Sequence, residues 1–169
     1  MSTSGTSRRL FGRYPTRALL LVCSVSSLAA FAQDWKPVGA FGWHGTGRLQ
    51  ELEKGHFYWV GEFSGIFLSD KGEGGLFHHS GVRCPAFNDI DLNNRKHRAG
   101  GYCVLMDADG DQAFGAWQSA GDGRRGPGTF SFTGGTGKYK GIAGGNSFVG
   151  TTEVQWPDGG VSGYSTWNK

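Results

Sequence analysis

Glu62 is the first residue in this chain whose type and setting suggest chemistry, because it is a carboxylate among aromatic residues. It lies in the run His56–Leu68, which alternates like a strand and places Tyr58 on the same face. Inside a barrel, a desolvated carboxyl group near a phenol is a candidate general acid or base. Outside, it is an ordinary solvated charge, and the alternation leaves both positions open.

Two adjacent histidines, His78 and His79, are the second group. They fall in an expected strand, Leu76–Val82, which would point them to opposite faces and admit one of them to a barrel lumen. His78 is therefore a third candidate catalytic residue, although a single strand histidine is more often a packing or surface group. The sequence contains no nucleophile motif and no phosphate-binding loop that would indicate a specific enzyme class.

Arg83 and Tyr102 each precede a cysteine and are candidates for ligand binding. A guanidinium at the mouth of a cavity orients a carboxylate, and a phenol donates a hydrogen bond. The residues expected to contact a ligand are Tyr58, Glu62, Arg83 and Tyr102.

Three aspartates at alternate positions, Asp107, Asp109 and Asp111, form a candidate calcium site, since Ca²⁺ prefers oxygen ligands. A complete calcium loop has glycine at its sixth position and glutamate at its twelfth, where this chain has Gln112 and Gln118. The Asp-Gly step within the segment is typical of a polar hairpin turn, which we favour. We expect neither a metal nor a cofactor.

Of the three cysteines, Cys23 falls within residues 1–32, which are predicted below to be a signal peptide. The remaining two, Cys84 and Cys103, are expected to form a disulfide, because an even number in an exported protein is typical of one. Their spacing lacks the close Cys-x-x-Cys pair of a zinc site. The polar segment Cys84–Arg98, which includes Pro85, is predicted to be one long loop that this disulfide ties down.

Residues 1–32 are predicted to be a signal peptide, with residues 33–169 as a single domain. Four arginines and no acidic residue precede a short apolar run that ends in Ala30-Phe31-Ala32. The pair Arg8-Arg9 leaves the general and twin-arginine secretion routes both open. Without this leader the chain has 13 basic and 14 acidic residues, so we expect no nucleic-acid partner. We expect a periplasmic or secreted protein that has no membrane partner once the leader is removed.

Glycine and aromatic residues dominate the rest of the chain, which holds 29 of the 31 glycines. Short aromatic and β-branched runs separated by glycine-rich turns predict strands, and no window shows sustained helical periodicity. We predict an all-β fold, an eight-stranded antiparallel barrel with a central cavity. The segments expected to supply these strands, nine stretches for a barrel of about eight, are Val38–His44, Gly47–Glu53, His56–Leu68, Leu76–Val82, Gly101–Asp107, Gln112–Ser119, Gly128–Thr133, Ser147–Trp156 and Gly160–Trp167.

The segment Thr129–Gly145, with Gly-Gly-Thr-Gly-Lys-Tyr at Gly134–Tyr139, resembles a signature of allene-oxide-cyclase-like barrels. That class includes the plant dirigent proteins, and small exported proteobacterial proteins share the same glycine-rich ending. The resemblance implies an eight-stranded barrel with a cavity and a homo-oligomer, a trimer. It carries over no cavity residue to a position in this chain.

Three functions fit these features. The first is binding of an apolar or aromatic small molecule in the lumen, which we rank first because no polar constellation for catalysis is visible. The second is a cofactor-free cyclase, isomerase or lyase that acts in the same cavity. The third is a structural or interaction protein whose barrel is filled by its own side chains.

Overall fold

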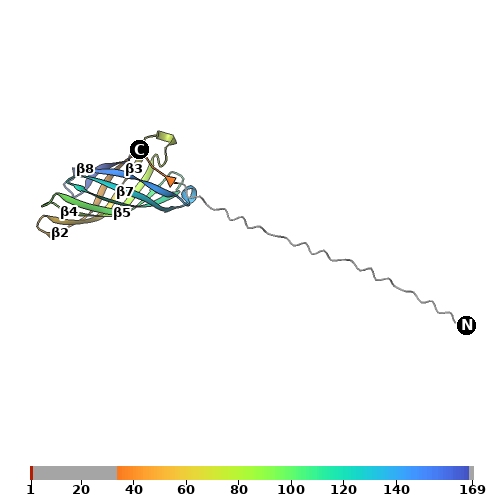
Figure 1. The fold of residues 1–169 in the computed structure, drawn as a ribbon, viewed down its shortest axis with the longest axis horizontal. Helices are drawn as coiled ribbons and strands as arrows, with labels where there is room; N and C mark the ends of the chain where they lie inside the picture. The colour runs from red at the N-terminus through yellow and green to blue at the C-terminus, as the bar shows by residue number, and fades with distance from the viewer. Residues whose placement is uncertain (2–33, 168–169) are drawn as a thin grey trace.

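Eight antiparallel strands close into a barrel in the computed structural model, which describes Met1 and residues 34–167 (Figure 1). Each strand pairs with the next along the chain, and β9 pairs with both β8 and β2 to complete the ring. The predicted all-β, eight-stranded barrel is therefore confirmed. The strands of the ring are β2 (Gly39–Glu53), β3 (His56–Ser69), β4 (Ser80–Asp91), β5 (Lys96–Met106), β6 (Gln112–Asp122), β7 (Arg125–Gly135), β8 (Ala143–Gln155) and β9 (Val161–Trp167).

Short elements complete the described part of the chain. Strand β1 (Asp34–Trp35) pairs in parallel with β8. Two helices of one turn, η1 (Gly72–Gly74) and η2 (Gly137–Tyr139), lie in loops, and no helix among the described residues is long and apolar enough to cross a membrane. The expected signal peptide and the cut before Gln33 fall within residues 2–33, outside the described part.

The two faces of β3 differ in burial. Trp59 and Phe67 are buried inside the barrel, whereas Val60, Ile66 and Leu68 on the alternate face are about half exposed. The inner face also has glycines, which allow bulky neighbours to approach the backbone closely. The outer face therefore carries apolar side chains of its own, which is why alternation alone did not identify the lumen.

Strand β2 runs unbroken through the Gly45-Thr46 step that the sequence suggested as a turn. Both residues pair with β3 in continuous register, Gly45 with Phe63 and Thr46 with Glu62. Glycine on this strand serves packing instead, because a Cβ at Gly47 would lie 2.6 Å from the indole of Trp59. The two predicted strands on either side are therefore one long strand.

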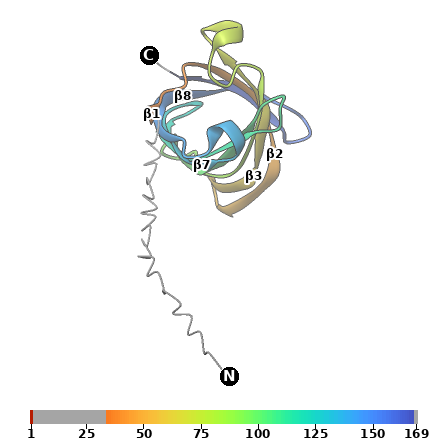
Figure 2. The same ribbon diagram turned by 90° about the vertical axis from the view of Figure 1, so that its right-hand side faces the viewer.

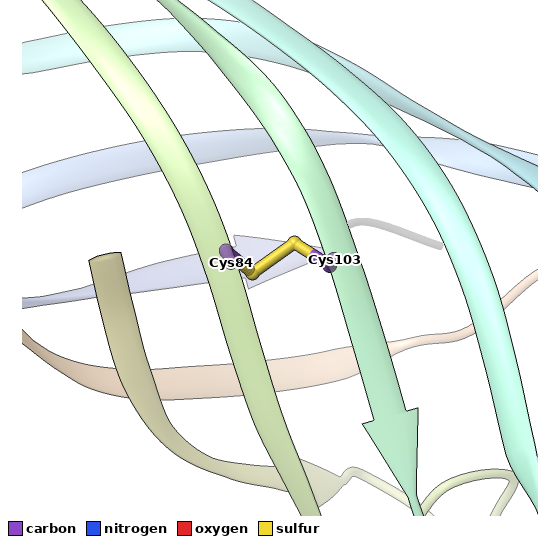
Figure 3. Close-up of a disulfide and its surroundings, with 2 residues drawn as sticks. All are labelled: Cys84 and Cys103. Carbon is purple, nitrogen blue, oxygen red and sulfur yellow. A yellow bond between two sulfur atoms is a disulfide. The ribbon is translucent and has the colours of Figure 1, made fainter. Parts of the chain in front are cut away.

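The predicted long loop at Cys84–Arg98 is wrong. Most of the segment is the second half of β4 and the start of β5, joined by a tight turn at residues 92–95. The Asp91 carboxylate accepts hydrogen bonds from the backbone of Asn93 and Asn94 and so stabilises that turn. The predicted disulfide is confirmed, but it links directly opposite residues of neighbouring strands, with 4.0 Å between their Cα atoms (Figure 3).

One end of the barrel is closed by aromatic packing. Phe77 and Tyr139, from the loops β3–β4 and β7–β8, are buried with ring centroids 4.9 Å apart. Phe132 of β7 packs against Phe77, and Ile142 belongs to the same buried cluster. Figure 2 faces this end and shows η2 lying across the ring of strands. The turns β2–β3, β4–β5, β6–β7 and β8–β9 gather at the opposite end.

Candidate functional site

A cavity of about 510 Å³ occupies the barrel lumen. Its wall extends to residues of the turns at the end opposite η2, including Leu92, Arg124 and Gly159, and does not include Phe77 or its ring partners Phe132 and Tyr139. The lumen is therefore a cup that is closed by the aromatic cluster at one end and open at the other. The aromatic side chains of its wall are Phe41, Trp43, Phe57, Trp59, Phe63, Trp117, Phe130, Phe148 and Trp167.

Glycines on the inner face make room in this cup. A Cβ at Gly126 would lie 2.6 Å from both His97 Nε2 and Ser119 Oγ, so this glycine accommodates both side chains. At Gly150 a Cβ would meet nothing closer than Ser165 Oγ at 3.7 Å, an ordinary van der Waals distance. Gly150 is thus a point where the cavity could be filled without displacing the backbone.

Polar side chains line the wall on β4, β5, β6, β8 and β9 and at the β6–β7 turn, and four of them lie on three consecutive strands. Asn88 is on β4, His97 on β5, and Trp117 and Ser119 are on β6. Asn88 Oδ1, His97 Nδ1 and Trp117 Nε1 are buried without a hydrogen-bond partner, while the Ser119 hydroxyl donates to the carbonyl of Pro127 at 2.9 Å. No aspartate or glutamate is among the described residues that line the cup.

His97 is the titratable imidazole of this wall. Burial lowers its pKa below the usual 6.5, although a backbone hydrogen bond with Gly123 and the charge of Asp122 oppose the shift. The ring is therefore neutral at pH 7. Sequence reasoning missed His97 because the basic run Arg95–Arg98 suggested a loop, whereas it starts a strand that turns Lys96 outward and His97 inward.

The residues predicted to bind a ligand lie outside the barrel. The Glu62 carboxylate pairs with the Arg83 guanidinium at 3.2 Å on the outer face, so the lumenal position considered for Glu62 is not observed. Tyr58 stacks on the outward-facing Phe87, and Tyr102 is 65% exposed. These four candidates share the outer face of β3, β4 and β5, but only Glu62 and Arg83 contact each other, and none of the four lines the cup.

The first four residues of the expected strand Leu76–Val82 form a turn, and β4 begins only at Ser80, which changes the arrangement of the histidines. Phe77 and His79 have left-handed backbone conformations, with φ of 59° and 61°, and the rings of His78 and His79 stack 3.9 Å apart. Both approach the Glu73 carboxylate at 3.9 Å. The prediction that they point to opposite faces is therefore wrong, and His78 lies outside the cup.

Glu73, His78 and His79 bring three potential metal ligands within 4.8 Å of one another. However, His78 Nδ1 accepts a hydrogen bond from the backbone N–H of Ser69 at 3.1 Å. In neutral histidine this places the proton on Nε2, the atom that faces Glu73. Metal-bound histidines donate from their second nitrogen, so this arrangement does not match that of a metal centre.

The aspartate triplet is occupied by a side-chain cation. Lys138 Nζ lies 2.7 Å from Asp107 Oδ2 and 2.9 Å from Asp109 Oδ2, while the Lys138 backbone N–H donates to Asp111. These contacts hold the pKa of Asp107 below its usual range, chiefly through the Lys138 hydrogen bond. The triplet therefore fastens the β5–β6 turn to η2, and the lysine occupies the position that calcium would take.

The glycine-rich motif has a structural explanation at this closed end. Gly137 has a φ of 49°, and a Cβ there would clash with the carboxylate of Asp111. The next residues place Lys138 on the aspartates and bury Tyr139 in the aromatic cluster. Burial, and then a hydrogen bond with Asp107, raise the pKa of Tyr139 to about 12.

No protein-family profile, curated protein sequence or solved structure shows significant similarity to this chain.

Proposed function

We propose that this chain is an exported β-barrel protein that binds an apolar or aromatic small molecule in its lumen. The observation that carries the proposal is the aromatic cup of about 510 Å³, closed at one end and open at the other. Ligand pockets are typically about 300–1,000 Å³ and mostly apolar, with a small number of polar groups. A barrel filled by its own side chains would leave no such volume.

The composition of the wall favours binding over catalysis. A cofactor-free cyclase or isomerase needs positioned groups that move protons, and the described wall offers His97 without a carboxylate beside it. The carboxylate first suggested for this role, Glu62, is paired with Arg83 on the outer face. Most of the remaining wall is aromatic or aliphatic surface, which stabilises an apolar ligand without chemistry.

Export and class membership are further parts of the proposal. The disulfide between Cys84 and Cys103 is typical of an oxidising compartment, which supports a periplasmic or secreted location. An eight-stranded barrel with a cavity is what the resemblance to allene-oxide-cyclase-like and dirigent-like proteins implies. The implied trimer would have an available interface in the apolar side chains that β3 and β5 expose outside the barrel, which include Val60, Ile66, Tyr102 and Met106.

Binding of straight-chain alcohols from hexanol to dodecanol, followed by calorimetry, tests the proposal. Each buried methylene contributes about 0.8 kcal/mol, so affinity should rise about fourfold per carbon until the cup is full. Naphthalene serves as the aromatic probe. A series that shows no binding at any length contradicts the proposal.

A matched pair of glycine substitutions locates the binding. Gly150→Leu projects into the cup, whereas Gly42→Leu projects from the outer face, where a Cβ meets nothing within 4 Å. Gly150→Leu should weaken the longest alcohols most, and Gly42→Leu should leave the series unchanged. Equal affinities in both variants would place the ligand elsewhere than in the lumen.

A further inference from the structure

Three polar side chains interrupt the apolar wall of the cup at one place. Asn88, Ala99 and Ser119 form one row across β4, β5 and β6, because Asn88 pairs with Ala99 and Ala99 pairs with Ser119. All three line the cup, and His97 lies two residues from Ala99 on the same face of β5. The small side chain of Ala99 leaves room between its neighbours for a ligand group. We call Asn88, His97 and Ser119 the polar patch.

The polar patch has hydrogen-bonding capacity to spare. The Ser119 hydroxyl donates to the carbonyl of Pro127 at 2.9 Å, so its oxygen remains available as an acceptor. A Cβ at Gly126 would lie 2.6 Å from both Ser119 Oγ and His97 Nε2, which makes these two atoms neighbours at one point of the wall. Asn88 Oδ1 and His97 Nδ1 are buried without a hydrogen-bond partner among the described residues. Buried polar groups without partners cost free energy, and a ligand that supplies a partner lowers that cost.

The patch carries no charge, and the wall around it carries little. Burial lowers the pKa of His97, so its ring is neutral at pH 7. Arg124, at the β6–β7 turn, is the only permanently charged residue among the described residues that line the cup, and its guanidinium donates to the carbonyl of Glu153 on β8 at 3.0 Å. A carboxylate or an ammonium held at the patch would lose its hydration without gaining a counter-charge there. The patch therefore suits an uncharged polar group.

Aromatic surface lies deeper in the cup than the patch. His97 is the second residue of β5 and Ser119 lies three residues before the end of β6, so both are near the turns of the open end. Trp117, two residues further into the barrel, packs against Phe63 of β3 and Phe148 of β8, with ring centroids 6.1 Å apart in both pairs. An apolar body directed toward the closed end would therefore meet aromatic rings while a polar end stays at the patch.

We infer that the lumenal ligand is an uncharged amphiphile, with a hydroxyl group that binds the polar patch and an apolar body that lies among the deeper aromatic rings. A hydroxyl both donates and accepts, so it can donate to Ser119 Oγ and accept from the Asn88 amide. An ether or a ketone lacks the proton that Ser119 Oγ accepts. This inference rests on the proposed function and narrows its ligand class.

Calorimetry with the isomers 1-nonanol and methyl octyl ether tests the inference, because both have the same atoms but only the alcohol has a proton to donate. We expect the alcohol to bind the wild type about threefold to tenfold more tightly than the ether. A wall without hydrogen-bonding groups would reverse this order, since desolvating a hydroxyl costs more than desolvating an ether. Nonanoate, which is charged at pH 7, should bind more weakly than the alcohol.

Two variants locate the hydroxyl group of the ligand. Asn88→Leu and Ser119→Ala should each lower the alcohol-to-ether affinity ratio about threefold. Ser131→Ala is the matched control, because it makes the same change on the exposed outer face of β7 and should preserve the wild-type ratio. Both probes are measured on the same protein sample, so partial unfolding of a variant lowers both affinities and does not itself change the ratio.

The outcomes separate this inference from the proposed function. An ether that binds the wild type as tightly as the alcohol, or a ratio that neither patch variant changes, overturns the inference and leaves lumenal binding standing. Tighter binding of nonanoate than of nonanol also overturns it, in favour of a carboxylate ligand held by Arg124. If neither isomer binds, the proposed function fails together with the inference.

Discussion

Phe77 is the residue at which the closed end of the barrel can be tested most sharply. Its ring is 4% exposed and packs against Phe132 and Tyr139, while its backbone has a φ of 59°. The side chain stabilises the closed end, and the backbone conformation costs free energy in any residue with a Cβ. These two contributions respond differently to substitution by alanine and by glycine.

The expected magnitudes follow from burial and from the left-handed backbone. Phe77→Ala should lower the free energy of unfolding by about 3–5 kcal/mol, as for other buried phenylalanines. Phe77→Gly loses the same ring but relieves the strained conformation, so it should be more stable than Phe77→Ala by about 1 kcal/mol. In ordinary strand or helix positions the order of glycine and alanine is reversed.

Urea denaturation followed by circular dichroism measures both variants against the wild type. Phe87→Ala is a control, because Phe87 lies half-buried on the outer face and should cost less. A loss below about 1 kcal/mol in Phe77→Ala would show that the ring does not close the barrel. A glycine variant less stable than the alanine variant would refute the left-handed turn.

Three further predictions concern the disulfide, His97 and the outer face. Replacing Cys84 and Cys103 by alanine should lower the free energy of unfolding by about 3 kcal/mol in the chain-entropy model, since the bond closes a loop with a sequence separation of 19; urea denaturation that shows no loss would contradict this. Because burial lowers the pKa of His97, the unfolded state binds more protons, so the stability that His97 contributes is lost as the pH falls from about 6.5 through the folded pKa. His97→Gln should therefore flatten the acid side of a stability–pH profile, and an unchanged profile would refute the assignment. Glu62→Gln should leave alcohol affinity unchanged and alter stability by less than about 1 kcal/mol, since its ion pair with Arg83 lies on the surface; a large loss of affinity by calorimetry would return Glu62 to the site.

The barrel could be predicted from sequence because strand alternation and glycine-rich turns are local signals. The face of β3 that lines the lumen could not, since Val60 and Ile66 outside are as apolar as the inner residues, and only pairing with neighbouring strands decides the matter. The polar run after Cys84 predicted a loop because both faces of this strand carry polar residues, as in a solvent-exposed loop. In the structure Asn88 faces the lumen and Asp89 faces outward.

The site was predicted less well than the fold. Glu62 was selected because it is a carboxylate among aromatic residues. Its ion-pair partner Arg83 lies on the neighbouring strand β4, and this contact can be predicted only when the pairing register of β3 and β4 is known. His97 was missed because it lies in a basic run. Residues two positions apart on a strand share a face, so the spacing of His97 and Ala99 could have placed both on the lumenal face. The ion pair of Lys138 with Asp107 could not be predicted either, because the β7–β8 loop and the β5–β6 turn meet only in the folded chain.

Native mass spectrometry of the gently purified protein, produced without residues 1–32, is the sharpest test of lumenal binding. We expect an additional mass on the wild type that is lost on denaturation, is absent from Gly150→Leu, and persists in Gly42→Leu. A bare wild-type protein that also fails to take up dodecanol would contradict lumenal binding. An additional mass that both variants retain equally would contradict it as well, because the ligand would then lie outside the cup.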